Sequence, residues 1–373
     1  MLISFGHLMH DTYTSFLAPM LPLLIEKFSL SYSMASLLGL IQRLPNLLNP
    51  FLGLLADRMG MRWLVIISPA LTAIAMSLIG LAPSYTVIAI LLLVTGVSSA
   101  LFHVPTPVMV RKVSGDQIGR GMSWYLFGGE IARTIGPLMA LGAISLWGLE
   151  GTWKLIPFGL AASGLLYFKL KKITISDEFR NKSDISGLRK TFSQSMPFFI
   201  LLIGLTFFRS IMRAVLTTFL PTYMTLKGES LWTGGIYLSV LELSGAVGTL
   251  FWGYYSDRIG RRKALKIIVY AAPVLMYLFS VTEGWVSLPV LAVLGFFLLG
   301  TTPILLALTQ DRGTERPAFF NSMFLTVSFG SEAAALMIAG VMADWIGLET
   351  TFTLSAVISL GAIPFVFMIK KTD

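Results

Sequence analysis

Near the start of the chain, the stretch GHLMHD at residues 6–11 gathers ionisable side chains that can bind and pass protons. His7 and Asp11 are four residues apart, so on a helix they share one face and can hydrogen bond. His10 lies about 100° around the helix from Asp11. The surrounding residues are apolar enough to span a membrane, where ionisable groups are costly and therefore functional candidates. The sequence predicts that His7 and Asp11 form a proton-handling or gating cluster.

Further ionisable residues fall within other apolar stretches of the chain. They are Arg43, His103, Glu130, Arg133, Arg209, Arg213, Glu242 and Glu332. Together with Asp11 they give four arginines against four carboxylates. This balance indicates pairing, since a lone charge at the centre of a membrane costs about 2.5–3.5 kcal/mol or more. His103, at a depth similar to that of Asp11, is predicted to join His7 and Asp11.

Two carboxylates compete for the role of proton carrier. One is Asp11, within the histidine cluster. The other is Glu130, provided that Arg133 pairs elsewhere, because burial without a partner favours a neutral acid that can load and release a proton. A third interpretation is that the Asp11 cluster is a buried polar network that only packs two helices together. The sequence leaves these alternatives open.

The composition excludes several classes of protein. Of the 373 residues, 55% are hydrophobic and 13% are charged, whereas soluble domains carry about 25% charged residues. No cysteine is present, which excludes disulfides, thiolate metal sites and a cysteine nucleophile. The chain also has no Walker loop, Rossmann glycine fingerprint or HExxH motif. We therefore expect a membrane protein that is not an enzyme, with no cofactor, no metal site and no nucleic-acid partner.

Twelve stretches have the length and apolarity of a membrane-spanning helix. They run over roughly 2–25, 33–56, 62–82, 86–110, 118–145, 152–170, 195–223, 232–256, 263–282, 285–309, 317–343 and 347–369. The polar and basic segment 171–194 is predicted to be a cytoplasmic linker between two six-helix bundles, 1–170 and 195–373. The loops on one side, with the C-terminal tail, hold 21 of the 28 lysines and arginines. This asymmetry predicts an inner-membrane protein with both termini in the cytoplasm.

The two halves of the chain resemble each other. GLLADRMGMR at 53–62 matches GYYSDRIGRR at 253–262, an offset of 200, and GLEGTW at 148–153 matches GLETTF at 347–352, an offset of 199. TSFLAP at 14–19 echoes TTFLP at 217–221. Repeated six-helix halves are typical of transporters, with the substrate site between the halves near the middle of the membrane.

The doubled loop resembles the signature loop of the major facilitator superfamily. The resemblance covers the whole chain and implies an all-α fold of two pseudo-symmetric bundles that works by alternating access. It also implies a cytoplasmic latch, which would comprise Gly53, Asp57, Arg58, Arg62, Gly253, Asp257, Arg258 and Arg262. The two leading glycines are expected to let helices approach closely. Each aspartate is expected to meet the following arginine or the N-terminus of a neighbouring helix. A topological anchor of basic residues is the alternative interpretation.

GHLMHDTYTSFLAPMLPLL, SSALFHVPTP and GGEIARTIGPL resemble the fosmidomycin-resistance branch of drug exporters. That resemblance implies export of an anionic phosphonate in exchange for protons. The chain departs from the branch pattern after Phe102 and His103, where a glutamate is missing, and at Glu130 and Arg133, where the branch tends to carry uncharged residues. We therefore do not carry the branch's substrate over to this chain.

GGEIARTIGP also resembles the antiporter motif of the superfamily's fifth helix. Gly136 and Pro137 are expected to bend this helix, because proline removes a hydrogen bond and clashes with the preceding turn. The bend favours exchange over uptake, although an ordinary membrane-helix kink would have the same sequence.

The repeat predicts which buried charges pair. At an offset of 199, Arg43 corresponds to Glu242 and Arg133 to Glu332. The resemblance implies that the second span faces the eleventh and the fifth faces the eighth. We therefore expect two interdomain ion pairs, Arg43–Glu332 and Arg133–Glu242. A local pair between Arg133 and Glu130, three residues apart on one face, is the alternative.

The cavity of such a transporter would be lined by cationic and aromatic side chains. Two arginines on one helix face can hold a phosphonate, phosphate or carboxylate. The substrate-binding candidates are Arg209, Arg213, Arg133, Tyr125, Trp124 and Tyr237. The predicted function is a proton-coupled exporter of a small organic anion or amphiphilic drug, acting as a monomer. A proton-coupled importer, and a membrane sensor or lipid scramblase on the same scaffold, are the alternatives.

Overall fold

The computed structural model describes residues 2–48, 61–115, 117–171, 188–312 and 317–369. The described residues form helices and connecting turns and contain no strand, which confirms the predicted all-α class. The chain divides into two compact units. The first comprises Met1–Arg180 with Thr218–Ser239, and the second comprises Asn181–Thr217 with Val240–Asp373.

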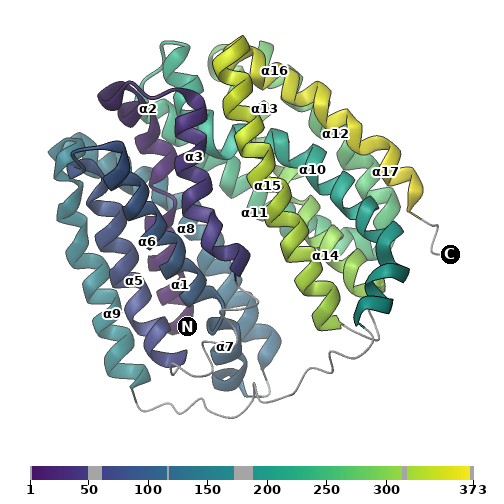
Figure 1. The fold of residues 1–373 in the computed structure, drawn as a ribbon, viewed down its shortest axis with the longest axis horizontal. Helices are drawn as coiled ribbons and strands as arrows, with labels where there is room; N and C mark the ends of the chain where they lie inside the picture. The colour runs from purple at the N-terminus through teal and green to yellow at the C-terminus, as the bar shows by residue number, and fades with distance from the viewer. Residues whose placement is uncertain (1, 49–60, 116, 172–187, 313–316, 370–373) are drawn as a thin grey trace. The chain divides into compact units, whose positions relative to one another are not determined.

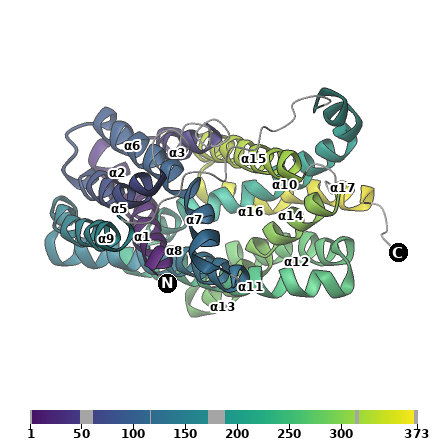
Figure 2. The same cartoon turned by 90° about the horizontal axis from the view of Figure 1, so that it is seen from below.

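The first unit builds its core around the N-terminal helix. Its helices are α1 (Leu2–Thr14), α2 (Leu17–Phe28), α3 (Tyr32–Arg43), η1 (Leu44–Leu48), α5 (Met61–Ser77), η2 (Ile79–Leu81), α6 (Tyr85–His103), α7 (Thr106–Ser114), α8 (Ile118–Trp147), η3 (Leu149–Leu155) and α9 (Ile156–Leu170). Helix α1 packs against α8, α5, α9 and α6 (Figures 1 and 2). Its ionisable side chains are therefore enclosed by protein.

The second unit contains the C-terminal helices. They are α12 (Arg261–Val281), η4 (Gly284–Val286), α13 (Ser287–Leu299), α14 (Thr301–Arg312), α15 (Pro317–Ile346), α16 (Leu348–Ser359), η5 (Leu360–Ala362) and α17 (Ile363–Met368). Two long helices, α10 (Leu188–Leu226) and α11 (Leu231–Ile259), contribute residues to both units. Within the second unit, α12 packs against α13, α14, α16 and α17.

Prolines explain where several helices are interrupted. The ring of a proline clashes with the carbonyl group four residues earlier and removes one hydrogen bond. Pro19 acts in this way on Ser15, where α1 gives way to α2, and Pro107 acts on His103, the last residue of α6. Pro303 acts on Leu299, the last residue of α13. Asp11 and His103 therefore both lie at or near a proline-induced break.

In the described part of the chain, eight helices are long and apolar enough to cross a membrane. The number rises to nine if two helices that meet at residue 148 with a bend of 117° are counted together as one span. The interruption between α1 and α2 explains why the first predicted span is not among the eight, since neither piece is long enough alone. A chain with this many apolar helices is a multi-pass membrane protein.

Two features of the sequence can be compared directly with local structure. The repeated GLE motif places Gly148 and Gly347 at equivalent turns, with φ values of +74° and +83°, which favour glycine. The central polar segment differs in part from its prediction, because α10 already begins at Leu188, inside the range predicted as a linker. The sequence LRKTFSQ that opens α10 contains neither glycine nor proline, so nothing in it prevents helix formation.

Gly136 sets the distance between α8 and α1. A Cβ atom at this position would lie 1.9 Å from the Ser15 Oγ atom and 2.6 Å from the Thr12 carbonyl oxygen. Gly136→Ala should therefore destabilise the protein by about 1–3 kcal/mol, as overpacking of a core does. Gly142→Ala is the matched control on the same helix, because nothing lies within 4 Å of its added methyl group. Thermal unfolding in detergent should separate the two variants, and equal melting temperatures would contradict this account.

Candidate functional site

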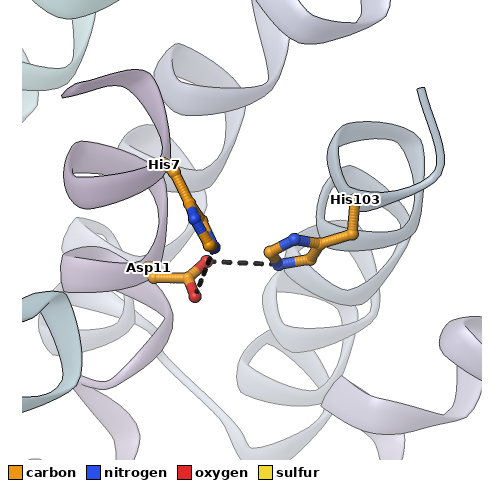
Figure 3. Close-up of side chains that lie close together, drawn as sticks. All are labelled: His7, Asp11 and His103. Atoms are coloured by element: carbon orange, nitrogen blue, oxygen red, sulfur yellow. Dashed lines mark ion pairs between the residues drawn. The ribbon is translucent and has the colours of Figure 1, made fainter. Parts of the chain in front are cut away.

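The structure brings His7, Asp11 and His103 together, as predicted (Figure 3). His7 and Asp11 lie on one face of α1, and His103 comes from the C-terminal end of α6. His7 Nε2 lies 3.2 Å from Asp11 Oδ2, and His103 Nε2 lies 3.2 Å from Asp11 Oδ1. The Oδ1 contact has ion-pair distance without hydrogen-bond alignment, so this buried oxygen has no hydrogen-bond partner among the described residues.

Tyr125 on α8 is within hydrogen-bond distance of the Nδ1 atoms of both His7 and His103. Its backbone oxygen lies 2.7 Å from His7 Nδ1, and its hydroxyl group lies 3.2 Å from His103 Nδ1. The Tyr125 ring also stacks on the His7 ring, with centroids 4.1 Å apart. Tyr125 was predicted as a substrate contact, and its hydrogen bonds to the cluster are a role that the sequence did not indicate.

The bond to Tyr125 decides where protons lie on His7. A carbonyl oxygen can only accept, so Nδ1 of His7 must carry a hydrogen and donate it. In a neutral ring, Nε2 would then turn a bare lone pair towards the Asp11 carboxylate at 3.2 Å. Two lone pairs repel at that distance, so a proton or another cation must lie between His7 and Asp11. The contact between His7 and Asp11 therefore holds a proton, on either partner, or another cation.

Gly129 on α8 allows the His7 ring to occupy this position. A Cβ atom at residue 129 would lie 2.5 Å from His7 Cε1 and 2.8 Å from His7 Nε2. The close approach depends on the absence of a side chain at this point of α8. Gly129 was not among the predicted site residues, although the pair Gly128–Gly129 in GGEIARTIGP was a signal in the sequence.

His10 belongs to a separate hydrogen-bond chain within the first unit. Thr72 donates to Ser98 Oγ at 2.8 Å, and Ser98 donates to the backbone oxygen of Ser68 at 3.0 Å. With its hydrogen used in this way, the Thr72 hydroxyl group accepts from His10 Nδ1 at 3.1 Å. His10 is fully buried and stacks on Phe102, with ring centroids 4.6 Å apart. These contacts fit a packing role for His10.

Glu130, the carboxylate on α8, has an ion-pair partner. Glu130 pairs with Arg133, its neighbour three residues later, which was the local alternative. The i,i+3 spacing brings the two groups together on one helix face. Glu130 was predicted to carry a proton only if Arg133 pairs elsewhere, and in the structure it has Arg133 as a partner. The pairing of Arg133 with Glu242 stays a prediction, and Glu242 is buried.

The second unit contains its own ionic contacts. Arg213 pairs with Glu332 at 2.8 Å, and Arg209 donates to the Thr302 hydroxyl group at 3.0 Å. Arg209 is buried, and its Nε atom has no hydrogen-bond partner in the described part of the chain. It also lines a narrow, mainly apolar cavity inside this unit. The pairing of Glu332 with Arg43 stays a prediction.

The aromatic substrate candidates lie in different environments. Trp124 is 41% exposed and its ring meets Phe127 edge-on. Tyr237 on α11 is buried. Their roles as substrate contacts stay predictions.

The predicted latch is described in part. Gly53, Asp57 and Arg58 lie outside the described residues, and Arg62 lies over the Trp63 ring.

The second latch loop corrects the expectation for Gly253 and decides between the two alternatives for Asp257. A Cβ atom on Gly253 would make only ordinary contact with Pro303 at 3.6 Å, so this glycine is not needed for close approach. Asp257 pairs with Arg261, the first residue of α12, and not with Arg258, whose side chain points to the Tyr254 hydroxyl group. Arg261 also reaches Asp311 at 3.4 Å, and Arg262 donates to the Phe367 backbone oxygen at 2.9 Å. These contacts join α11, α12, α14 and α17 within the second unit.

The fold and the site define a multi-pass helical membrane protein with an ionisable cluster buried among its helices. Residues 3–335 match the family model of the Major Facilitator Superfamily, so the chain belongs to that superfamily. It is accordingly a secondary transporter and not an enzyme.

Individual relatives agree with this assignment. The chain is similar to the fosmidomycin resistance protein of Escherichia coli (strain K12), with 24% identity over 98% of this chain and 91% of the relative. It is 33% identical to the multidrug resistance protein MdtG of Proteus mirabilis (strain HI4320), over 39% of this chain and 38% of the relative.

Solved structures share the fold. A bacterial homologue of the human lysosomal transporter Spinster, in an inward-facing and occupied conformation, has a TM-score of 0.81 at 14% identity and covers 98% of this chain and 95% of its own. A mutant of the nucleoside transporter NupG has a TM-score of 0.80 at 17% identity, covering 99% of both chains.

The His10 network can be separated from the Asp11 cluster by mutation. Thr72→Val removes the acceptor of His10 and the donor to Ser98, so it should lower stability by about 1–3 kcal/mol through an unsatisfied buried group. Transport per folded molecule should be retained, because Thr72 does not touch Asp11. Thermal unfolding and vesicle transport measured on the same preparation test this. Lost transport with unchanged stability would contradict a packing role for His10.

Proposed function

We propose that this protein is a proton-coupled exporter that exchanges protons for a small organic anion or amphiphilic drug by alternating access. It would have twelve membrane spans in two six-helix bundles, with both termini in the cytoplasm of a cell whose inner membrane it spans. The protonatable group would be the pair formed by His7 and Asp11.

The observation that carries this proposal is the orientation of the His7 ring. Because Nδ1 donates to the Tyr125 carbonyl group, the contact between Nε2 and Asp11 needs a proton. A group that must hold a proton in one conformation can release it in another, once the helices that position it move. His103 completes the cluster and is its most exposed member, at 30% of its side chain, against 7% for His7 and 11% for Asp11. It would be the point of exchange with water.

The position of the cluster favours coupling to movement. Asp11 lies four residues before the break between α1 and α2, and His103 is the last residue of α6 before its own break. Interrupted helices in transporters lie beside ion and substrate sites. A shift of α1 against α6 would change both contacts of Asp11. By contrast, the ion pair with Arg133 makes Glu130 the weaker candidate for the proton carrier.

Export is favoured by two observations of different kinds. The relatives named above include a fosmidomycin resistance protein and a multidrug resistance protein. Gly136, which is closely packed against Thr12 and Ser15, and the following Pro137 lie in a segment that resembles an antiporter motif. An importer of an organic anion remains the second candidate, supported by Arg209 and Arg213 on α10. Flux in proteoliposomes driven by an imposed pH gradient distinguishes the two by its direction.

Replacing the proposed carrier should uncouple transport from protons. Asp11→Asn should abolish proton-driven flux and leave substrate binding, because the amide keeps the shape of the side chain but carries no proton at that atom. The ionisable groups around Asp11 are His7, His10 and His103, and Arg133 acts electrostatically on His7. Glu130→Gln should retain more flux. Glu150→Gln is an exposed carboxylate control whose flux should be unchanged.

Counterflow, which needs no net proton movement, should survive in Asp11→Asn and shows that the variant folds and binds. Full proton-driven flux in Asp11→Asn would contradict the assignment of the carrier.

The two proposed interdomain pairs, Arg43–Glu332 and Arg133–Glu242, can be tested by crosslinking. The chain contains no cysteine, so introduced cysteines have no native competitor. The double variants Arg43→Cys with Glu332→Cys and Arg133→Cys with Glu242→Cys should crosslink to an extent that changes with substrate and pH. The pairing of Arg43→Cys with Glu242→Cys is the mismatched control. Equal crosslinking of matched and mismatched variants would contradict the proposed pairs.

A further inference from the structure

The cluster of His7, Asp11 and His103 has the donor set and spacing of a metal site. Each residue offers one ligand atom, and these three atoms lie within 4.8 Å of one another. Tetrahedral zinc with nitrogen and oxygen ligands at 2.0–2.2 Å separates neighbouring ligand atoms by about 3.3 Å. Each imidazole Nε2 atom lies 3.2 Å from one oxygen of the Asp11 carboxylate, His7 from Oδ2 and His103 from Oδ1, which is close to that separation.

The groups around the cluster are those that support metal-binding histidines. A ligating histidine usually donates its other ring N–H to a carbonyl, carboxylate or water, which fixes the tautomer and turns the free lone pair to the metal. His7 does so through Nδ1 to the Tyr125 backbone oxygen at 2.7 Å, and Nδ1 of His103 meets the Tyr125 hydroxyl group at 3.2 Å. Both Nε2 atoms therefore face Asp11.

A cation would also satisfy what the cluster leaves unsatisfied. Asp11 Oδ1 is buried without a hydrogen-bond partner among the described residues. The lone pair of His7 Nε2 faces the carboxylate and needs a positive charge between them. Imidazole ligands suit zinc, copper, iron and nickel better than magnesium or calcium, and one carboxylate leaves room for a water molecule as a further ligand. The exposed edge of His103 gives a route of entry.

We propose that His7, Asp11 and His103 form a binding site for a divalent first-row transition-metal cation of the zinc and cobalt type. The ion binds the two Nε2 atoms and the Asp11 carboxylate, and so ties α1 to α6. It occupies the place of the proton proposed above, so the metal and the proton compete for the same atoms, and its binding does not depend on the direction of transport.

The amino-acid composition leaves few other residues that could bind a transition metal. The chain holds three histidines and no cysteine, so a site with nitrogen ligands needs His7, His10 or His103. The probe is Co²⁺ alone, added to the full chain in detergent after removal of any histidine tag and followed by its visible absorption. We expect saturable binding of one ion that Zn²⁺ displaces. Asp11→Asn and His103→Gln should weaken binding by about tenfold or more, and Tyr125→Phe by about tenfold through the lost support of His103.

His10→Gln is the matched control. It removes a buried histidine from the same helix but not a proposed ligand, so its dissociation constant should equal that of the wild type. Zn²⁺ should raise the unfolding temperature of the wild type and of His10→Gln, but not that of Asp11→Asn, since a ligand that binds only the folded state stabilises it.

Three results would overturn the proposal. They are no Co²⁺ binding by the wild type, unchanged binding by His103→Gln, and a loss of binding in His10→Gln as large as in His103→Gln. Because His103 is partly exposed, His103→Gln should fold. Its Co²⁺ binding therefore tests the proposal even if Asp11→Asn does not fold. A failure of this test would leave the proton-coupled flux of the wild type intact, which distinguishes it from a failure of the proposed function.

Discussion

The single hydrogen bond from His7 Nδ1 to the Tyr125 carbonyl group constrains the whole site. It fixes which nitrogen carries the hydrogen and so turns the other nitrogen towards Asp11 at 3.2 Å. Inside a membrane protein, where the surroundings screen charge poorly, two facing lone pairs are not tolerated without a positive charge between them. The need for a proton or cation follows from this bond, and Gly129 is what allows the His7 ring to lie close enough to α8 to make it.

Helix interruptions determine where this bond is placed. A helix is interrupted about four residues before each of Pro19, Pro107 and Pro303. The ring of a proline clashes with the carbonyl group of the residue four positions earlier, which explains this spacing. Two of these breaks flank the contact between α1 and α6. Backbone that is already interrupted can rearrange at lower cost than a continuous helix, so the cluster lies where a small movement would alter its contacts most.

The two units of the chain bury different polar groups. The first holds a cluster of two imidazoles and a carboxylate, whereas in the second Arg209 and Thr302 form a hydrogen bond of 3.0 Å. An arginine keeps its charge at any physiological pH, whereas imidazole and carboxylate groups change theirs. The repeated motif thus places Gly148 and Gly347 in turns with similar φ values, while the buried groups of the two units differ in their ability to exchange a proton.

The sequence by itself determined the helical membrane class and the repeat, which are visible as apolar stretches and matched motifs. It also determined the contact between His7 and Asp11, because residues four positions apart share one face of a helix. Only the tertiary structure decided the rest. Tyr125 and Gly129 contact His7 from a helix more than a hundred residues later in sequence, and Asp257 pairs with Arg261 and not with its neighbour Arg258. Such choices depend on which side chains face each other across packed helices, and that information is spread over the whole chain.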